Sequence, residues 1–361
     1  MHVDADRPAG AVTPGRPTMN DVARTAGVSL KTVSRVVNGE TNVSPDLVTR
    51  VRAAIDALHY RPNIGASALR RSDRRTNTIG MLLEDVGNPF SSSLHRAVED
   101  EARLRGVQVL TGSLDEEPQR ERELARVFTM RRTDGLIIAP ASPDQSYLTT
   151  EVQIDTPVVF VDRPAFGINA DSVLSTNVTG ATEAVRHLVA HGHRAVAYLG
   201  DYTRIATARS RYQGYLAALD EAGIGADSTV VIPDLHTVTA AESAVMTLFT
   251  RRRPPTALFT SQNLVTVGAV RALRRLNLHR RVALVGFDDF PLADLLDPAL
   301  TVVAQDPAMM GRAAAQALFG RIDGDTGAPR EIWIPTSLIR RGSGEIPPSP
   351  DLLEGHSPTA L

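Results

Sequence analysis

Apolar positions between residues 18 and 60 recur at helical spacing in three short runs. Thr18 followed by Asp21 predicts a capping box at the start of a first helix, and Gly27 predicts its end. Ser29 predicts the cap of a second helix, and the dipeptide 44–45, Ser-Pro, predicts the start of a third. Two short helices joined by a glycine-containing turn predict a helix-turn-helix, whose second helix fits a DNA major groove. The apolar positions are Val22, Ala23 and Ala26; Val33, Val36 and Val37; and Leu47, Val51, Ile55 and Leu58.

The pattern changes after Arg75 to short β-rich apolar runs that alternate with amphipathic helices. Near-continuous apolar strands separated by helices predict parallel sheets that are covered on both faces. A break near residues 165–178 divides the series into two blocks. The sequence therefore predicts an α/β body of two doubly wound lobes with a cleft between them. The expected strands are 79–83, 107–110, 135–138, 157–161, 195–199, 257–260, 282–285 and 301–303.

Charge separates the two parts of the chain. Between Thr18 and Arg75, ten basic residues face five acidic ones, a net charge of +5. The whole chain has a net charge of −2 and residues 1–17 are balanced, so residues 76–361 total −7. A basic head on an acidic body favours phosphate binding by the head. A three-helix segment that only packs would leave this charge unexplained.

Composition narrows the class further. The chain has 361 residues, 42% of them apolar, and no cysteine, which excludes disulfides and thiolate metal sites. No apolar stretch long enough to span a membrane and no apolar leader are found, so we expect a cytoplasmic protein. We expect no cofactor and no metal. His191 and His193 are expected to close a helix, since no third ligand lies near them.

The ordered string in the head identifies a family resemblance. It comprises Asp21-Val22-Ala23, Ala26-Gly27-Val28-Ser29, the run Thr32-Val33-Ser34-Arg35-Val36-Val37-Asn38, and Tyr60-x-Pro62-Asn63-x-x-Ala66-x-x-Leu69. This string resembles the lactose-repressor (LacI/GalR) family of bacterial transcription regulators, and the likeness extends over about residues 18–342.

The resemblance implies an all-α N-terminal helix-turn-helix headpiece on a two-lobed, periplasmic-binding-protein-like body. In that family the chain crosses between the lobes three times. The expected parts are a disordered tail (1–17), the DNA-binding domain (18–62), a hinge helix and linker (63–75), the effector-binding and dimerisation body (76–342) and a disordered tail (343–361). Within the body, the N-lobe is expected at about 76–174 and 305–334, and the C-lobe at about 175–304 and 335–342.

The second helix should carry the DNA-reading side chains. Leu30, Lys31 and Arg35 project from the side opposite the buried valines. Lys or Arg can donate to guanine O6 and N7, and a leucine can contact a thymine methyl group. Short hydroxyl side chains suit phosphate oxygens, and the resemblance places Ala66 and Leu69 in a hinge helix that contacts the minor groove. The predicted DNA-binding set is Thr18, Ser29, Leu30, Lys31, Thr32, Ser34, Arg35, Asn38, Asn63, Ala66, Leu69 and Arg70.

An effector should bind where parallel strands end, because ligands of such sheets occupy the crevice at the carboxyl ends of the strands. The resemblance assigns ligand contacts to Asp162, Arg211 and Asp288. Carboxylates accept sugar hydroxyls, and a guanidinium donates a two-pronged fork. Two structural alternatives stay open: Asp289 caps the next helix, and Arg163 pairs with an acid across the lobe interface. The predicted effector set is Asn88, Phe90, Ser91, Asp162, Arg211, Gln262 and Asp288.

One segment departs from the family pattern. Residues 261–263 read Ser-Gln-Asn where many members carry Asn-Asp, so a strong hydroxyl acceptor is missing there. The effector's identity is therefore left open, with a sugar or sugar derivative favoured, and so is the direction in which it acts.

Taken together, these features predict a homodimeric, effector-controlled regulator that binds a palindromic operator and represses a catabolic operon. A hydrolase is one alternative, suggested by Asp288 and Asp289, but no nucleophile elbow, phosphate loop or zinc-protease motif is found. A transport binding protein is another, but it would need export and gives no reason for residues 18–71. We therefore expect no enzymatic activity.

Overall fold

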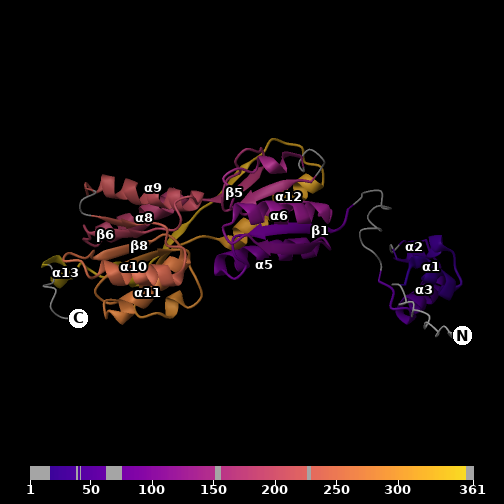
Figure 1. Cartoon of the computed structure of the whole chain (residues 1–361), viewed down its shortest axis with the longest axis horizontal. Coiled ribbons are helices and arrows are strands. Elements are labelled where there is room, and N and C mark those ends of the chain that lie inside the picture. The colour runs from indigo at the N-terminus through magenta and orange to yellow at the C-terminus, as the bar shows by residue number, and fades with distance from the viewer. Residues whose placement is uncertain are drawn as a thin grey trace, which may run out of the picture. The chain divides into compact units, whose positions relative to one another are not determined.

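The computed structural model describes residues 17–37, 40, 42–61, 75–150, 156–225 and 229–354 (Figure 1). The chain forms two compact units that meet in the sequence between Thr76 and Asn77. The first holds the head, and the second holds the two-lobed body.

The head consists of three helices, as predicted: α1 (Met19–Ala26), α2 (Leu30–Val37) and α3 (Pro45–Ala57). The capping box is present, since the Asp21 carboxylate accepts the Thr18 amide N–H at 2.9 Å and the Asp21 amide donates to the Thr18 hydroxyl at 3.4 Å. Gly27 ends α1 with a φ of 62°, a left-handed value that favours glycine. Arg50 of α3 donates to the Ala26 carbonyl at 2.8 Å and so fixes the end of α1. The apolar runs close this core, in which Val22, Val33 and Val51 are fully buried.

The first lobe is built on a six-stranded, wholly parallel sheet in the order β11-β5-β4-β3-β1-β2. Alternate residues of β1 point to opposite faces. Met81 packs with α5 and α12 on one face, whereas Leu82 packs with α6 on the other. The strands are β1 (Thr78–Leu83), β2 (Gln108–Ser113), β3 (Leu136–Ile138), β4 (Val158–Val161), β5 (Asp171–Ser175) and β11 (Glu331–Ile334). The helices are α5 (Pro89–Leu104), α6 (Pro118–Met130) and α12 (Pro307–Ile322), with a short 3-10 turn at Ser146–Leu148.

The second lobe repeats this plan with a sheet in the order β12-β10-β9-β8-β6-β7, in which only β12 is antiparallel to its neighbour. One face is covered by α8 and α9, and the other by α10 and α11. Gly214 lets α9 lie close against α8, because a Cβ there would collide with the carbonyl oxygen of Val178. The strands are β6 (Val196–Leu199), β7 (Val230–Ile232), β8 (Ala257–Thr260), β9 (Ala283–Phe287), β10 (Thr301–Ala304) and β12 (Ser337–Ile339). The helices are α8 (Asn177–Ala190), α9 (Ala206–Glu221), α10 (Val238–Leu248) and α11 (Asn263–Arg275), with a 3-10 turn at Ala293–Leu295.

The chain passes between the lobes three times: after β5, between β10 and α12, and between β11 and β12. Both sheets therefore combine a long continuous stretch with one strand from the end of the chain. Among the described residues, no helix is both long and apolar enough to cross a membrane.

The expected disorder from residue 343 is wrong for residues 343–354. A 3-10 turn at Ser343–Glu345 and a short helix, α13 (Pro350–Glu354), follow β12. The Ser343 hydroxyl is buried and donates to the Leu284 carbonyl at 2.6 Å. Leu352 is only 2% exposed and belongs to the core of the second lobe. The proline-rich composition gave no sign of this, because single anchoring residues leave no periodic pattern. Residues 355–361 lie outside the described part.

Candidate functional sites

Two aspartates occupy matching positions in the two lobes. Asp162 directly follows β4 and Asp288 directly follows β9, with φ values of 69° and 70°. Each donates its amide N–H to the neighbouring strand, to Val173 at 2.9 Å and to Val303 at 2.8 Å. A left-handed backbone is unfavourable for a residue other than glycine, so these sheet bonds hold both turns in place.

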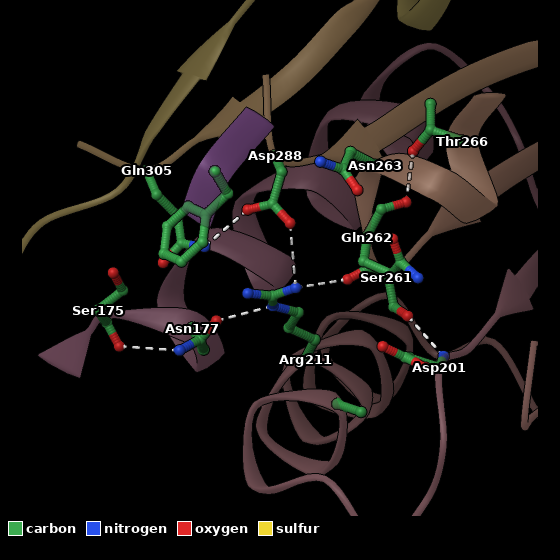
Figure 2. A network of polar contacts seen from close by, with 12 residues as sticks. Ser175, Asn177, Asp201, Arg211, Ser261, Gln262, Asn263, Thr266, Asp288 and Gln305 are labelled. Carbon is green, nitrogen blue, oxygen red and sulfur yellow. Dashed lines mark hydrogen bonds and ion pairs between the residues drawn. The ribbon is translucent and has the colours of Figure 1, made fainter. Parts of the chain in front are cut away.

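Arg211 of α9 pairs with Asp288, whereas Asp162 lies 3.5 Å from Nε of Arg163. The Nε of Arg211 donates to the Asn177 side chain at 2.7 Å, and its Nη1 donates to the Ser261 carbonyl at 2.7 Å and lies 3.4 Å from Asp288 Oδ2 (Figure 2). The guanidinium also lies 3.9 Å from the centre of the Phe287 ring. Arg211 is only 5% exposed, and its Nη2 donates to no side chain or carbonyl of the described residues. One donor of a rigidly held cation therefore remains available.

Two acceptors in this cluster are buried without a donor. Gln305 Nε2 donates to Asp288 Oδ1 at 2.6 Å, but Gln305 Oε1 has no hydrogen-bond partner in the described structure. Asp162 Oδ1 is likewise buried and has no hydrogen-bond partner among the described residues. Leaving a buried acceptor unpaired costs about 1–3 kcal/mol. Burial is the largest influence on Asp162 and raises the pKa of its carboxyl, while the charges of Arg163 and Arg211 oppose the rise.

The start of α5 forms the first-lobe side of the cleft. Asn88 caps α5 by accepting the Phe90 amide N–H at 3.0 Å, and it also accepts a bond from the Asn263 side chain of the second lobe at 2.8 Å. The lobes are thus joined by a buried pair of amides. A cavity of about 360 Å³ opens beside it, a size suited to a small molecule. It is lined by Pro89, Phe90, Ser92, Ser93, Asp288, Asp289, Phe290, Pro291, Gln305 and Pro307.

A second inter-lobe contact involves His236. Its Nδ1 lies 2.8 Å from Asp201 Oδ1 in the second lobe, and its Nε2 lies 3.5 Å from Glu84 Oε1 in the first. Burial raises the pKa of Glu84 to about 7, while the pKa of His236 is raised by its carboxylate partners against the effect of burial. Tyr202 stacks on the imidazole with ring centres 4.5 Å apart. This link between the lobes is therefore sensitive to protonation.

The head presents an exposed face on α2. Leu30 is 44% exposed and Lys31 is exposed, whereas Val33 beside them is fully buried. Ser29 caps α2 by accepting the Thr32 amide N–H at 3.1 Å, and the two hydroxyls lie 2.9 Å apart. The exposed face thus carries one cation and one apolar side chain on a capped helix.

Both the head and the body of the chain match known protein families. Residues 18–63 match the model of bacterial regulatory proteins of the lacI family, and residues 185–344 match that of the periplasmic binding protein-like domain. The chain is 34% identical over 331 residues to the HTH-type transcriptional regulator GalS of Salmonella typhimurium, covering 90% of this chain and 96% of the relative.

The chain belongs to the LacI family. It is 32% identical over 335 residues to the ribose operon repressor of Escherichia coli, which it covers to 99%. The crystal structure of the lac repressor dimer bound to operator and an anti-inducer superposes with a TM-score of 0.76 at 26% identity, covering 91% of this chain and 99% of that one. This LacI-family protein is accordingly a DNA-binding transcription regulator and not an enzyme.

Several predicted residues of this LacI-family regulator lie together in the cleft. Asp288 and Arg211 are in contact. The charge of Arg211 lowers the pKa of Asp162, and the charge of Asp288 raises it. Ser91 instead is 3% exposed within the first lobe and does not line the cavity, whose serines are Ser92 and Ser93. The predictions at Asn38, Asn63, Ala66, Leu69 and Arg70 fall outside the described residues.

The side chains of Gln262 and Asn263 are used differently. Gln262 Oε1 accepts the Leu264 amide N–H at 2.6 Å as the cap of α11, and its Nε2 donates to the His236 carbonyl at 3.3 Å. Both ends of this amide are used in the fold. Asn263, which is not in the predicted effector set, makes the bond to Asn88 across the cleft.

The structural alternatives considered for Arg163 and Asp289 differ from the contacts that these two residues make. Arg163 pairs with Glu116 of its own lobe, Nη1 to Oε2 at 3.0 Å, and not with an acid across the interface. Asp289 pairs with Arg341 at 2.8 Å and accepts the Phe290 amide N–H. His191 is the C-cap residue of α8, as expected.

In the head, Thr18 and Ser29 act as helix caps, so their hydroxyls are committed in part to the fold. Arg35 lies 3.5 Å from Glu40, a surface pair that DNA phosphates would compete for. Leu30 and Lys31 keep the exposure that base reading requires.

Proposed function

We propose that this regulator is a homodimeric repressor of a sugar-catabolic operon, controlled by a sugar bound between the lobes. The observation that supports the effector site is the group around Asp288, in which Gln305 Oε1 and Asp162 Oδ1 are buried acceptors without donors and Nη2 of Arg211 is unused. A polyhydroxylated ring supplies hydroxyl donors for the acceptors and an acceptor for the guanidinium.

The shape of the site suits such a ligand. Phe90 lines the cavity with an aromatic ring, against which the apolar face of a sugar ring can lie. The charges of Asp162 and Asp288 are offset in part by Arg211, so a neutral ligand meets directed hydrogen bonds and little net field. Ribose is the first candidate, because ribose operon repressors of Escherichia coli and Bacillus subtilis are 32% and 34% identical to this chain.

Binding in the cleft gives a route to control of the head. The ligand would contact residues of both lobes, so it would favour the lobe arrangement that fits it best. The amide pair Asn88–Asn263 and the pair His236–Glu84 would stabilise the same arrangement. If the DNA-bound dimer prefers one arrangement, sugar affinity and DNA affinity must be coupled reciprocally.

The head would read the operator with α2. Leu30 and Lys31 would contact base edges, and Arg35 would contact DNA once released from Glu40. A two-fold symmetric dimer requires a roughly palindromic operator with half-site centres about one helical turn apart. The protein would act in the cytoplasm, where such DNA is found.

Isothermal titration of the full-length protein with D-ribose and a panel of other sugars tests the effector site. We expect at least one sugar to bind one-to-one per subunit, and the variant Asp288→Asn to lose about tenfold or more in affinity, since a charge-assisted hydrogen bond contributes about 1.5–3 kcal/mol. The exposed variant Arg271→Gln on α11 is the matched control. Equal sugar affinity in Asp288→Asn and wild type would contradict the proposed site.

A further inference from the structure

A second cavity lies at the other side of the cleft and shares no lining residue with the one beside Asp288. It encloses about 380 Å³ between first-lobe loops that follow β2, β3 and β4 and the start of α9 in the second lobe. Its charged lining residues are Glu116, Arg163, Arg204 and Arg209. We refer to this cavity as the arginine pocket.

The arginine pocket carries an excess of positive charge. Arg163 pairs with Glu116, donates to the Pro140 carbonyl at 2.9 Å and lies 3.5 Å from Asp162, so its charge is matched by buried carboxylates. Arg204 and Arg209 are exposed, and no carboxylate of the described chain lies within ion-pair distance of either. Two cations therefore face the cavity without a counter-charge.

Both of these arginines are held in place. The Arg209 guanidinium donates to the Arg204 carbonyl at 2.6 Å and to the Thr203 carbonyl at 3.2 Å. The Arg204 guanidinium lies 4.0 Å from the centre of the Tyr202 ring and 3.5 Å from the Glu116 carbonyl of the other lobe. An arginine fixed in this way loses little conformational freedom when it binds an anion.

The start of α9 adds to the positive field. Residues 205 and 206 line the cavity, and the N-cap residue is Ile205, which has no side-chain acceptor for the first amides of the helix. The amino end of a helix carries partial positive charge and exposed N–H groups. An anion in the arginine pocket would take the place of the missing cap.

The first-lobe wall is preformed by buried polar groups. Glu121 is fully buried and accepts the amide N–H groups of Ala141 and Ser142 at 2.5 and 2.7 Å, as well as the Tyr147 hydroxyl at 2.7 Å. Gln145, also fully buried, accepts the Phe166 amide N–H at 2.9 Å. Burying such groups is costly unless every bond is made, and here those bonds fix the shape of a surface loop.

We propose that the arginine pocket binds the phosphoryl group of a small phosphorylated ligand. A dianionic phosphate matches the two unpaired guanidinium groups and the end of α9, and the carbon skeleton of the ligand would lie against Pro140, Pro143 and Phe166. The phosphoryl group belongs either to the molecule that fills the central cleft or to a separate co-effector. Because the pocket draws on both lobes, an anion there would stabilise their closed arrangement in either case.

The test measures phosphate binding by thermal denaturation and titration of the full-length protein. Potassium phosphate should raise the melting temperature above that in potassium chloride of equal ionic strength, and D-ribose 5-phosphate should bind more tightly than inorganic phosphate. The double variant Arg204→Gln/Arg209→Gln, compared with its own baseline, should bind both about tenfold or more weakly. Arg271→Gln, which removes an exposed arginine on α11, should bind them as wild type does. Equal shifts in phosphate and chloride, or equal affinities in the double variant and wild type, would overturn the proposal.

The variant Arg211→Gln separates the two sources of the phosphoryl group. If this variant keeps inorganic phosphate binding but loses D-ribose 5-phosphate binding, the phosphate is part of the cleft ligand. If it keeps both, the ligand of the arginine pocket is a separate molecule. Retained phosphate binding supports the arginine pocket even if no neutral sugar binds the cleft, so the failure of one proposal is distinguishable from the failure of the other.

Discussion

Replacing Arg211 with glutamine removes the cation that pairs with Asp288 and that, together with Arg163, lowers the pKa of Asp162. The wild-type guanidinium makes bonds of 2.7 Å to Asn177 and to Ser261 and an ion pair of 3.4 Å to Asp288. Removing one partner of a buried pair costs about 3–5 kcal/mol, because the other charge stays buried. Gln305 still donates to Asp288 in the variant, which favours the lower half of that range.

This loss should be visible in the thermal unfolding of the body. In domains of this size each kcal/mol lowers the melting temperature by roughly 2–4 °C, so a loss of about 3–4 kcal/mol should lower the melting temperature of Arg211→Gln by about 6–16 °C at neutral pH. Sugar binding should fall below detection, since the site loses its donor. Arg271→Gln should match wild type in both measurements.

The pH dependence adds a readout that a merely structural defect would not give. The positive charge of Arg211 lowers the pKa of Asp162, so its removal raises that pKa further. A raised folded-state pKa gives stability that is present at low pH and lost as pH rises. The gap in melting temperature between variant and wild type should therefore narrow as the pH falls from neutral. A melting temperature equal to that of wild type, or a gap independent of pH, would refute this reasoning.

Three further perturbations probe other parts of the account. Gln262→Ala should lower unfolding stability by about 0.5–2 kcal/mol through the lost cap of α11 and leave sugar affinity unchanged, whereas Asn263→Ala should weaken sugar binding in a titration. Burial raises the pKa of Glu84 from its usual 4.5 to about 7, so Glu84 contributes stability at low pH that is lost as the pH rises through 7. In Glu84→Gln the melting temperature should therefore fall less with rising pH than in wild type. Lys31→Ala should reduce operator affinity by about tenfold and relax base preference, without changing the melting temperature, as measured by fluorescence anisotropy on operator variants.

Much of the site could be predicted because parallel strands place their carboxyl ends at one edge of a sheet. Asp162 and Asp288 each follow a continuous apolar run, so their strand-end positions were readable without coordinates. Glu84 after β1 and Gln305 after β10 also follow apolar strands, and neither is in the predicted effector set. The ends of the apolar strands thus indicate more of the cleft residues than the family resemblance alone.

Other features had no readable signal. Which of two adjacent amides caps α11 depends on the backbone turn, and Gln262 caps it while Asn263 crosses the cleft. His236 follows the short and partly exposed β7, where no apolar run marks a strand end. Ser91 was misplaced because helical periodicity turns it inward and leaves Ser92 and Ser93 at the cavity.

The central claim is that the cleft and the DNA-reading head are coupled. The most direct test takes a duplex enriched from random sequence by the full-length protein and measures its dissociation constant with and without a saturating sugar that titration shows to bind the cleft. The account predicts a change of about 5–150-fold in wild type, the usual range of allosteric coupling, and no change in Arg211→Gln. An unaltered dissociation constant in wild type, with the cleft saturated, would contradict it.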